Sequence, residues 1–258
     1  MPEPMQTKVD GLRAVDLQYR PIREIATGRS PFFQSRTQLN TPELGTLMPE
    51  VFRRPAEFSG QSRKLFPLEL IAMLEAVQAF KDREMMFEWF TVYVSMRTLR
   101  DVALEPLVTS TCDQMDIMPG RVCLTLPQGA LDETDGIAAN AAERLRRRGF
   151  HVMVTDFGEN GCSFLKLSDI PADYVMLSPR ITRYIGKNDR GDSAVRSVVS
   201  VLDDMGCKVI ADGIRNSKQA EALYEFGCNY CAGSLAGNYL PYESYLPETA
   251  AQEPQEKH

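Results

Sequence analysis

Runs of strand-forming residues alternate with runs of helical periodicity along most of the chain, and this alternation restricts the fold more than any other feature. Helical stripes, with apolar residues three and four positions apart, lie between the later strand-like runs, for example at 68–80 and 194–202. Eight alternating strands predict an α/β fold, a TIM-type (β/α)8 barrel rather than an open sheet. The strand-like segments are 17–22, 31–37, 90–96, 121–126, 151–156, 173–177, 208–211 and 229–232.

The first two strand-like runs break this alternation. Thr27 and Gly28 join them by a tight turn, which leaves no room for a crossover helix and predicts an antiparallel hairpin. The expected barrel is therefore a modified one. We expect a single barrel domain at 17–246, an N-terminal tail at 1–16 and a disordered C-terminal tail at 247–258, where PETAAQEPQEKH shows no apolar period.

The charge of the chain limits its partners. A formal net charge of -6 and a pI near 5.2 argue against nucleic acid or an anionic membrane, because both attract basic surfaces. No apolar run is long enough to cross a bilayer or to form the core of a signal peptide. We therefore expect a cytoplasmic protein with neither nucleic-acid nor membrane partners.

The six cysteines are expected to be reduced thiols in that compartment. Cys228 and Cys231 have CxxC spacing, but no second pair and no nearby histidine completes a tetrahedral zinc set. Buried structural thiols are the favoured interpretation, and a redox or metal role for this pair is the alternative.

Functional residues of such barrels lie at the carboxyl ends of the strands. The only carboxylates at those ends are Asp156 and Asp212, which is a small set for chemistry. Asp156 opens an Asp-Phe-Gly triplet, which protein kinases use to hold magnesium, but the chain has no His-Arg-Asp catalytic loop and a kinase is excluded. Because aspartates before Gly158 and Gly213 readily cap turns, a structural role is the favoured interpretation of both acids.

Ordered motifs along the chain resemble those of EAL-domain proteins, the cyclic di-GMP phosphodiesterases. YRPI with Thr27-Gly28 is similar to the family's opening strand and turn, and NTPELG at 40–45 to the segment after its signature tripeptide. The Asp-Phe-Gly loop, IPADYVML at 170–177, VIADGI at 209–214 and FGCNYCAG at 226–233 are similar to later motifs. The resemblance covers about 17–241 and implies an EAL-like barrel.

The resemblance also implies an active site in which two divalent cations, held by several carboxylates, activate water against a phosphodiester. Most of those positions carry other residues here. Gln34 stands at the first metal-binding glutamate, and Gln38 at an arginine that meets a substrate phosphate. The other vestigial positions are Tyr93 at a metal-ligating asparagine, Cys123 and Leu126 at two glutamates, Thr155 and Asp156 at an aspartate pair, Met176 at the catalytic lysine, Ser178 at an aspartate, Asp212 at a late glutamate and Ala232 at a glutamine.

These replacements predict no catalytic residue, no metal site and no cofactor. The favoured function is a non-catalytic signalling regulator that acts through contact with a protein partner of unknown identity, and a homodimer is compatible with this. The alternative is a receptor that holds cyclic di-GMP or another nucleotide without cleaving it. An active cyclic di-GMP phosphodiesterase is the least favoured function.

Binding of cyclic di-GMP is expected to be weak or absent, because Gln38 lacks the charged fork that arginine offers a phosphate. Arg36, Arg97 and Arg180 are the candidates for a replacement charge. The loop at 159–162, after Asp-Phe-Gly, is the candidate protein interface, and Gly161 predicts that this loop is more mobile than in active relatives.

Overall fold

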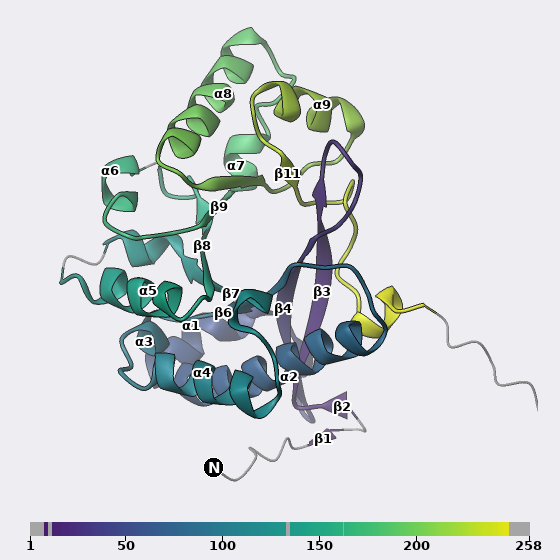
Figure 1. Cartoon of the computed structure of the whole chain (residues 1–258), viewed down its shortest axis with the longest axis vertical. Helices are drawn as coiled ribbons and strands as arrows, with labels where there is room; N and C mark the ends of the chain where they lie inside the picture. Colours follow the sequence, from purple (N-terminus) through teal and green to yellow (C-terminus); the bar gives the residue numbers. More distant parts are fainter. Residues whose placement is uncertain (1–7, 10–11, 133–134, 162, 248–258) are drawn as a thin grey trace, which may run out of the picture.

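The computed structural model describes residues 8–9, 12–132, 135–161 and 163–247 and shows a closed barrel surrounded by helices (Figure 1). Its strands are hydrogen-bonded in the order β3-β11-β10-β9-β8-β7-β6-β4, and β3 also pairs with β4, which closes the ring. The short strand β5 extends the sheet beyond β4. The predicted TIM-type barrel is confirmed.

Every strand of the ring overlaps a segment expected from the sequence. The ring consists of β3 (Val15–Glu24), β4 (Phe32–Thr41), β6 (Trp89–Tyr93), β7 (Val122–Pro127), β8 (His151–Phe157), β9 (Tyr174–Leu177), β10 (Lys208–Ala211) and β11 (Tyr230–Cys231). The strands outside it are β1 (Lys8–Val9), β2 (Leu12–Arg13) and β5 (Gly45–Leu47).

The helices are α1 (Pro49–Ser59), α2 (Ser62–Asp82), α3 (Met96–Leu99), α4 (Leu104–Gln114), α5 (Ile137–Arg147), α6 (Phe164–Leu167), α7 (Pro179–Thr182), α8 (Asp189–Asp204) and α9 (Ser217–Glu225). The two apolar stripes expected at 68–80 and 194–202 lie in α2 and α8. Within the described residues, none of the helices is both long and apolar enough to span a membrane.

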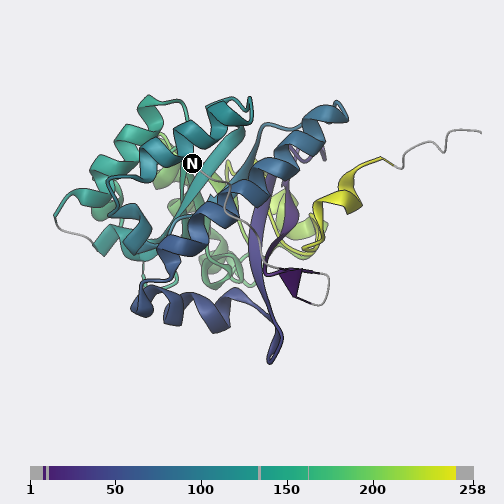
Figure 2. The ribbon, with the colours of Figure 1, turned by 90° about the horizontal axis from the view of Figure 1, so that it is seen from below.

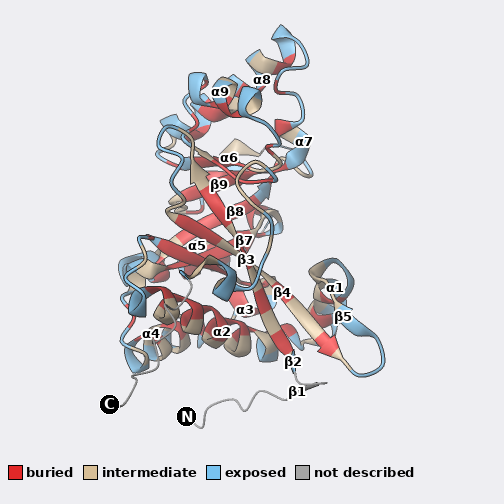
Figure 3. Cartoon of the chain, turned by 90° about the vertical axis from the view of Figure 1, so that its right-hand side faces the viewer, coloured by how far each residue is buried: buried red, intermediate tan, exposed pale blue. Residues whose placement is uncertain are grey.

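The hairpin formed by the first two strands of the ring is confirmed. β3 is antiparallel to β4 and to β11, whereas the other neighbours in the ring run parallel. Gly28 takes a φ of 73° in the connecting turn, a conformation that glycine adopts without steric cost. Because β4 continues past the ring, it projects with β5 beside α1 (Figure 2, Figure 3).

Several boundaries differ from the sequence-based expectation, and β4, for example, runs to Thr41 rather than to residue 37. The third strand of the ring ends at Tyr93 rather than at residue 96, because the Ser95 hydroxyl accepts the Thr98 N–H at 3.2 Å and starts α3 there. The segment expected as an N-terminal tail contains β1 and β2, which pair with each other, and the start of β3. Residues 1–7, 10–11 and the C-terminal 248–258 lie outside the described residues.

The core has two parts because side chains of a strand alternate between the two faces of the sheet. The inner cluster fills the barrel and contains Ile22, Phe32, Trp89, Cys123, Met153, Tyr174, Met176, Ile210 and Ala232. The outer cluster joins the sheet to the helices, and the burial is visible as the red strands and inward helix faces of Figure 3. The inner cluster consists of apolar and aromatic side chains, and the His151 ring at the start of β8 lies against two of them, Trp89 and Tyr174.

Candidate functional site

The open end of the barrel, where the parallel strands reach their carboxyl ends, is organised around Arg20 of β3. Nη2 of Arg20 lies 2.8 Å from Asp212 Oδ2, and its Nε donates a hydrogen bond to Gln34 Oε1 at 2.8 Å. Gln34 in turn donates through Nε2 to Met176 Sδ at 3.5 Å. Three of the expected site positions therefore meet around a residue that was not expected from the sequence.

The ion pair between Arg20 and Asp212 is largely shielded from water, with 12% and 17% of the two side chains exposed. Burial by itself lowers the pKa of Arg20, but the neighbouring acidic groups, Asp212 foremost, together outweigh it and raise that pKa above its ordinary value. Asp212 also accepts the Gly213 N–H through Oδ1 at 2.6 Å, so the predicted turn cap is confirmed at this position. The Asp212 carboxylate thus accepts a hydrogen bond from the turn and also pairs with the Arg20 guanidinium.

Tyr239, in the segment after β11, lies against the same cation. The centre of its ring is 4.9 Å from Arg20 Cζ and 4.1 Å from Arg36 Cζ, and its hydroxyl donates to Gln34 Oε1 at 3.1 Å. Burial raises the pKa of Tyr239 to about 12, so the hydroxyl stays a neutral donor at physiological pH.

Asp156 is the second acid of the open end and has an unusual backbone conformation. Its φ is 58°, in the left-handed region, where the pairing of β8 with β9 shifts register. The turn that follows is closed by the main chain, with the Glu159 N–H donating to the Asp156 carbonyl at 3.0 Å. The backbone, rather than the expected carboxylate cap, therefore forms this turn. Burial raises the pKa of Asp156, and the negative charge of Asp212 adds to the effect.

Several expected positions lie outside this cluster. Cys123 and Ala232 belong to the inner apolar core, whereas Leu126 packs in the outer core between sheet and helices. Thr155 is buried and its hydroxyl donates to the Leu126 carbonyl at 3.3 Å. Gln38 extends along β4 to Met48, whose Sδ accepts its amide at 3.8 Å.

The loop after Asp-Phe-Gly is tied to its surroundings. Ser178 donates its hydroxyl to Glu159 Oε2 at 2.6 Å, and Arg180 Nε lies 2.7 Å from Glu159 Oε1. The Gln128 amide donates to the Gly161 carbonyl at 2.7 Å. These contacts argue against the greater mobility expected for the loop, of which Cys162 lies outside the described residues.

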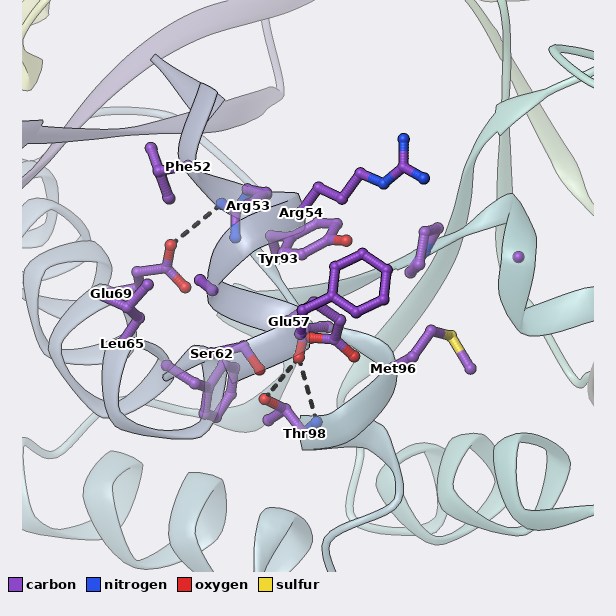
Figure 4. Close-up of a pocket in the computed structure, with 16 residues that line it drawn as sticks. Phe52, Arg53, Arg54, Glu57, Ser62, Leu65, Glu69, Tyr93, Met96 and Thr98 are labelled. Atoms are coloured by element: carbon purple, nitrogen blue, oxygen red, sulfur yellow. Dashed lines mark hydrogen bonds and ion pairs between the residues drawn. The ribbon is translucent and has the colours of Figure 1, made fainter. Parts of the chain in front are cut away.

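A pocket of about 420 Å³ lies beside the open end, between α1, α2 and the start of α3 (Figure 4). Tyr93 lines it, with Arg53 Cζ 3.8 Å from the centre of its ring. Arg53 also pairs with the buried carboxylate of Glu69 at 3.0 Å. The ring of Tyr93 is therefore in contact with the Arg53 guanidinium, whose charge is neutralised by Glu69.

The CxxC cysteines are buried thiols. Cys228 and Cys231 are both free, and burial raises their pKa values to about 12 and about 11. A thiol must lose its proton before it attacks or binds a metal, and these two resist that loss. The geometry supports the structural interpretation of this pair.

Two residues of the open end, Arg20 and Tyr239, were not among the positions expected from the sequence. Arg20 stands two positions from the inward-facing Ile22, and this alternation was a signal that a charge points into the barrel. Tyr239 gave no such signal, because it lies more than 200 positions along the chain from its partner Gln34 and in no regular element.

An eight-stranded barrel with one antiparallel strand and an apolar interior defines a modified TIM-type barrel. The chain belongs to the EAL domain family, and the match covers residues 10–239. It is 25% identical over 213 residues to Cyclic di-GMP phosphodiesterase PdeR of Escherichia coli, covering 80% of this chain and 32% of that protein. It is 23% identical over 232 residues to Cyclic di-GMP phosphodiesterase PA2567 of Pseudomonas aeruginosa, covering 90% of this chain and 38% of that protein.

Solved structures show the same fold. The PaMucR phosphodiesterase in its c-di-GMP complex superposes with a TM-score of 0.82 at 20% identity, over 90% of this chain and 94% of that one. The FimX EAL domain from Pseudomonas aeruginosa bound to c-di-GMP gives 0.75 at 14% identity, over 88% and 90%. The chain spans roughly a third of the length of the PdeR and PA2567 proteins.

Proposed function

We propose that this chain is a non-catalytic EAL-domain signalling protein that acts by contact with another protein. The observation that carries the proposal is the ion pair of Arg20 with Asp212 at the open end of the barrel. A fixed guanidinium against this carboxylate supplies the positive charge that a bound cation would otherwise bring. The acid is therefore engaged by the protein itself.

The residues at the open end do not fit the two divalent cations that the family resemblance implies. Each such cation needs several hard oxygen ligands, largely carboxylates. Gln34, Cys123, Leu126 and Thr155 supply no carboxylate, and the carboxylate of Asp212 is paired with Arg20. Across the described ranges, no three His, Cys, Asp or Glu side chains gather in a way that could hold a metal.

The residue at the position where the family resemblance implies a catalytic lysine supports the same proposal. Met176 is buried and its sulfur accepts the amide of Gln34. A thioether neither carries a proton nor offers a positive charge to a phosphate. Among the residues that the structure describes, the open end therefore lacks both the lysine and the carboxylate set that the family resemblance implies for activating water.

A receptor that binds cyclic di-GMP or another nucleotide without cleaving it is the second candidate. It is favoured by the family and by the likeness to the FimX EAL domain, a protein whose structure is described as bound to c-di-GMP. Gln38 argues against it, because a neutral amide replaces the arginine implied at a phosphate. An active phosphodiesterase, as the PdeR and PA2567 names describe those proteins, is the third.

Purified protein is expected to hydrolyse neither cyclic di-GMP nor its linear product in the presence of Mg²⁺ or Mn²⁺, because the carboxylates for two cations are replaced. Chromatography of the nucleotides over hours provides the measurement. The Asp156→Ala variant is the control for contaminating activity. Turnover that scales with protein concentration and disappears in this variant would contradict the proposal.

The candidate contact surface is the loop at 159–161 together with Arg180, here called the rim. Glu159 is its charged centre, since it accepts the Ser178 hydroxyl and pairs with Arg180. Affinity capture from the native cells identifies partners, and their binding is then compared between the wild type and Glu159→Lys.

Loss of binding in the folded Glu159→Lys variant is the expected result, because the substitution reverses the charge and releases Arg180. Glu221→Lys, an equal charge change at an exposed position of α9, is the matched control and is expected to bind normally. Unchanged binding by Glu159→Lys would show that the interface lies elsewhere.

A further inference from the structure

Two arginine side chains share one aromatic ring at the open end of the barrel. Arg20 Cζ lies 4.9 Å and Arg36 Cζ 4.1 Å from the centre of the Tyr239 ring. The two arginines have different partners. Arg20 pairs with a carboxylate, that of Asp212 at 2.8 Å. Arg36 instead donates through Nη2 to a neutral amide oxygen, Gln18 Oε1, at 3.0 Å.

The guanidinium of Arg36 is incompletely satisfied. Its Nε is buried and has no hydrogen-bond partner among the described residues. A buried donor without an acceptor costs free energy, and more so when it belongs to a charged group. The negative face of the Tyr239 ring is the compensation that the structure provides, because a π face attracts a cation. The ring thus occupies the place that an anion would take.

The side chain of Tyr239 is held more weakly than its backbone. The neighbouring Leu240 exchanges two main-chain hydrogen bonds of 2.8 Å with Tyr19 of β3. Tyr245 adds a second anchor, with its hydroxyl 2.9 Å from the Tyr19 carbonyl. The Tyr239 side chain has one hydrogen bond, to Gln34 Oε1 at 3.1 Å, besides its stacking. Rotation of the ring therefore leaves the segment that carries it in place.

We propose that Tyr239 is an internal plug over an anion site formed by Arg36 and Arg20, and that the ligand class of this site is a phosphate-bearing molecule. With the ring in place, the aromatic face neutralises Arg36 and the site is closed. With the ring removed, Arg36 presents Nε and Nη groups to a phosphate in the forked geometry that guanidinium groups favour. The plug is a property of the free protein and does not depend on a protein partner.

The test compares phosphate binding with and without the ring, by isothermal titration calorimetry of the full chain. The probes are inorganic pyrophosphate, which reports on the anion site alone, and cyclic di-GMP, which adds bases. Tyr239→Ala and Tyr239→Ser open the site, whereas Tyr239→Phe keeps the ring and is the matched closed control. Arg36→Met in the Tyr239→Ala background removes the cation.

The open variants are expected to bind at least one probe 10-fold or more tighter than the wild type, because one additional charged contact is enough for a tenfold gain in affinity. The Tyr239→Phe variant is expected to bind like the wild type. Arg36→Met is expected to abolish the gain. Equal binding by wild type and open variants, or a gain that survives Arg36→Met, overturns the plug. Failure of both open variants to fold, judged by circular dichroism, also overturns it, because the ring would then be a structural element.

Discussion

Replacing Gly233 with alanine is expected to lower the free energy of unfolding by about 4 kcal/mol or more, an effect at the upper end for a single substitution. Gly233 follows β11 with a φ of 126°, which side-chain-bearing residues rarely adopt. A Cβ built there lies 2.5 Å from the Ile214 carbonyl oxygen and 2.6 Å from its nitrogen. Both are main-chain atoms, so no side chain can rotate away to make room.

The clash is also expected to break main-chain hydrogen bonds that join Ile214 to the segment around Gly233. The Ile214 N–H donates to the Ala232 carbonyl at 3.0 Å, and the Leu235 N–H donates to the Ile214 carbonyl at 3.1 Å. Each buried group that loses its partner costs about 1–3 kcal/mol. Urea unfolding followed by circular dichroism measures the total.

Gly206→Ala is the matched control for Gly233→Ala. Gly206 has a φ of 79°, but no heavy atom lies within 4 Å of a Cβ built there. The control therefore carries the backbone strain without the clash and is expected to cost about 1–2 kcal/mol. If the two variants are equally stable, the close approach of Ile214 is not rigid and the steric argument fails.

The fold followed from the sequence because its determinants are local. Strand-forming runs, the Thr27-Gly28 turn and helical stripes each depend on residues close together in the chain, so the strands and the opening hairpin were predicted. The third strand was extended to residue 96 because Ser95 in an apolar run resembles a strand residue, although its hydroxyl caps α3. Propensity alone does not separate these two roles.

The site was only partly predictable, because its contacts join distant segments. Asp212 was expected to cap a turn, and it does so through the adjacent Gly213. Its ion pair crosses the barrel to Arg20, and the Tyr239 ring arrives from a third segment. Contacts of this kind depend on strand order and register across the whole barrel, which local sequence patterns do not reveal. Carrying over family positions also placed Leu126 at the site, although the alternation of β7 turns it toward the helices.

The Arg20→Met variant is expected to be less stable than the wild type by about 3 kcal/mol, the lower end of what breaking a buried ion pair costs. Methionine keeps the apolar stem but removes the charge, so Asp212 is left with 17% of its side chain exposed and no cation. Gln34 loses a donor at the same time. Thermal and urea unfolding of the two proteins provide the measurement.

A double-mutant cycle with Asp212→Asn separates the ion pair from simple loss of packing. Asparagine retains the Oδ1 that accepts the Gly213 N–H, so the turn survives while the charge is removed. Arg20→Met with Asp212→Asn is therefore expected to be more stable than Arg20→Met alone, because no unpaired carboxylate remains buried. If the double variant is no more stable than the single one, Arg20 does not act as the charge partner of Asp212. The guanidinium would then contribute through packing and its contact with Gln34, and the proposal that it takes the place of a bound cation would lose its main support.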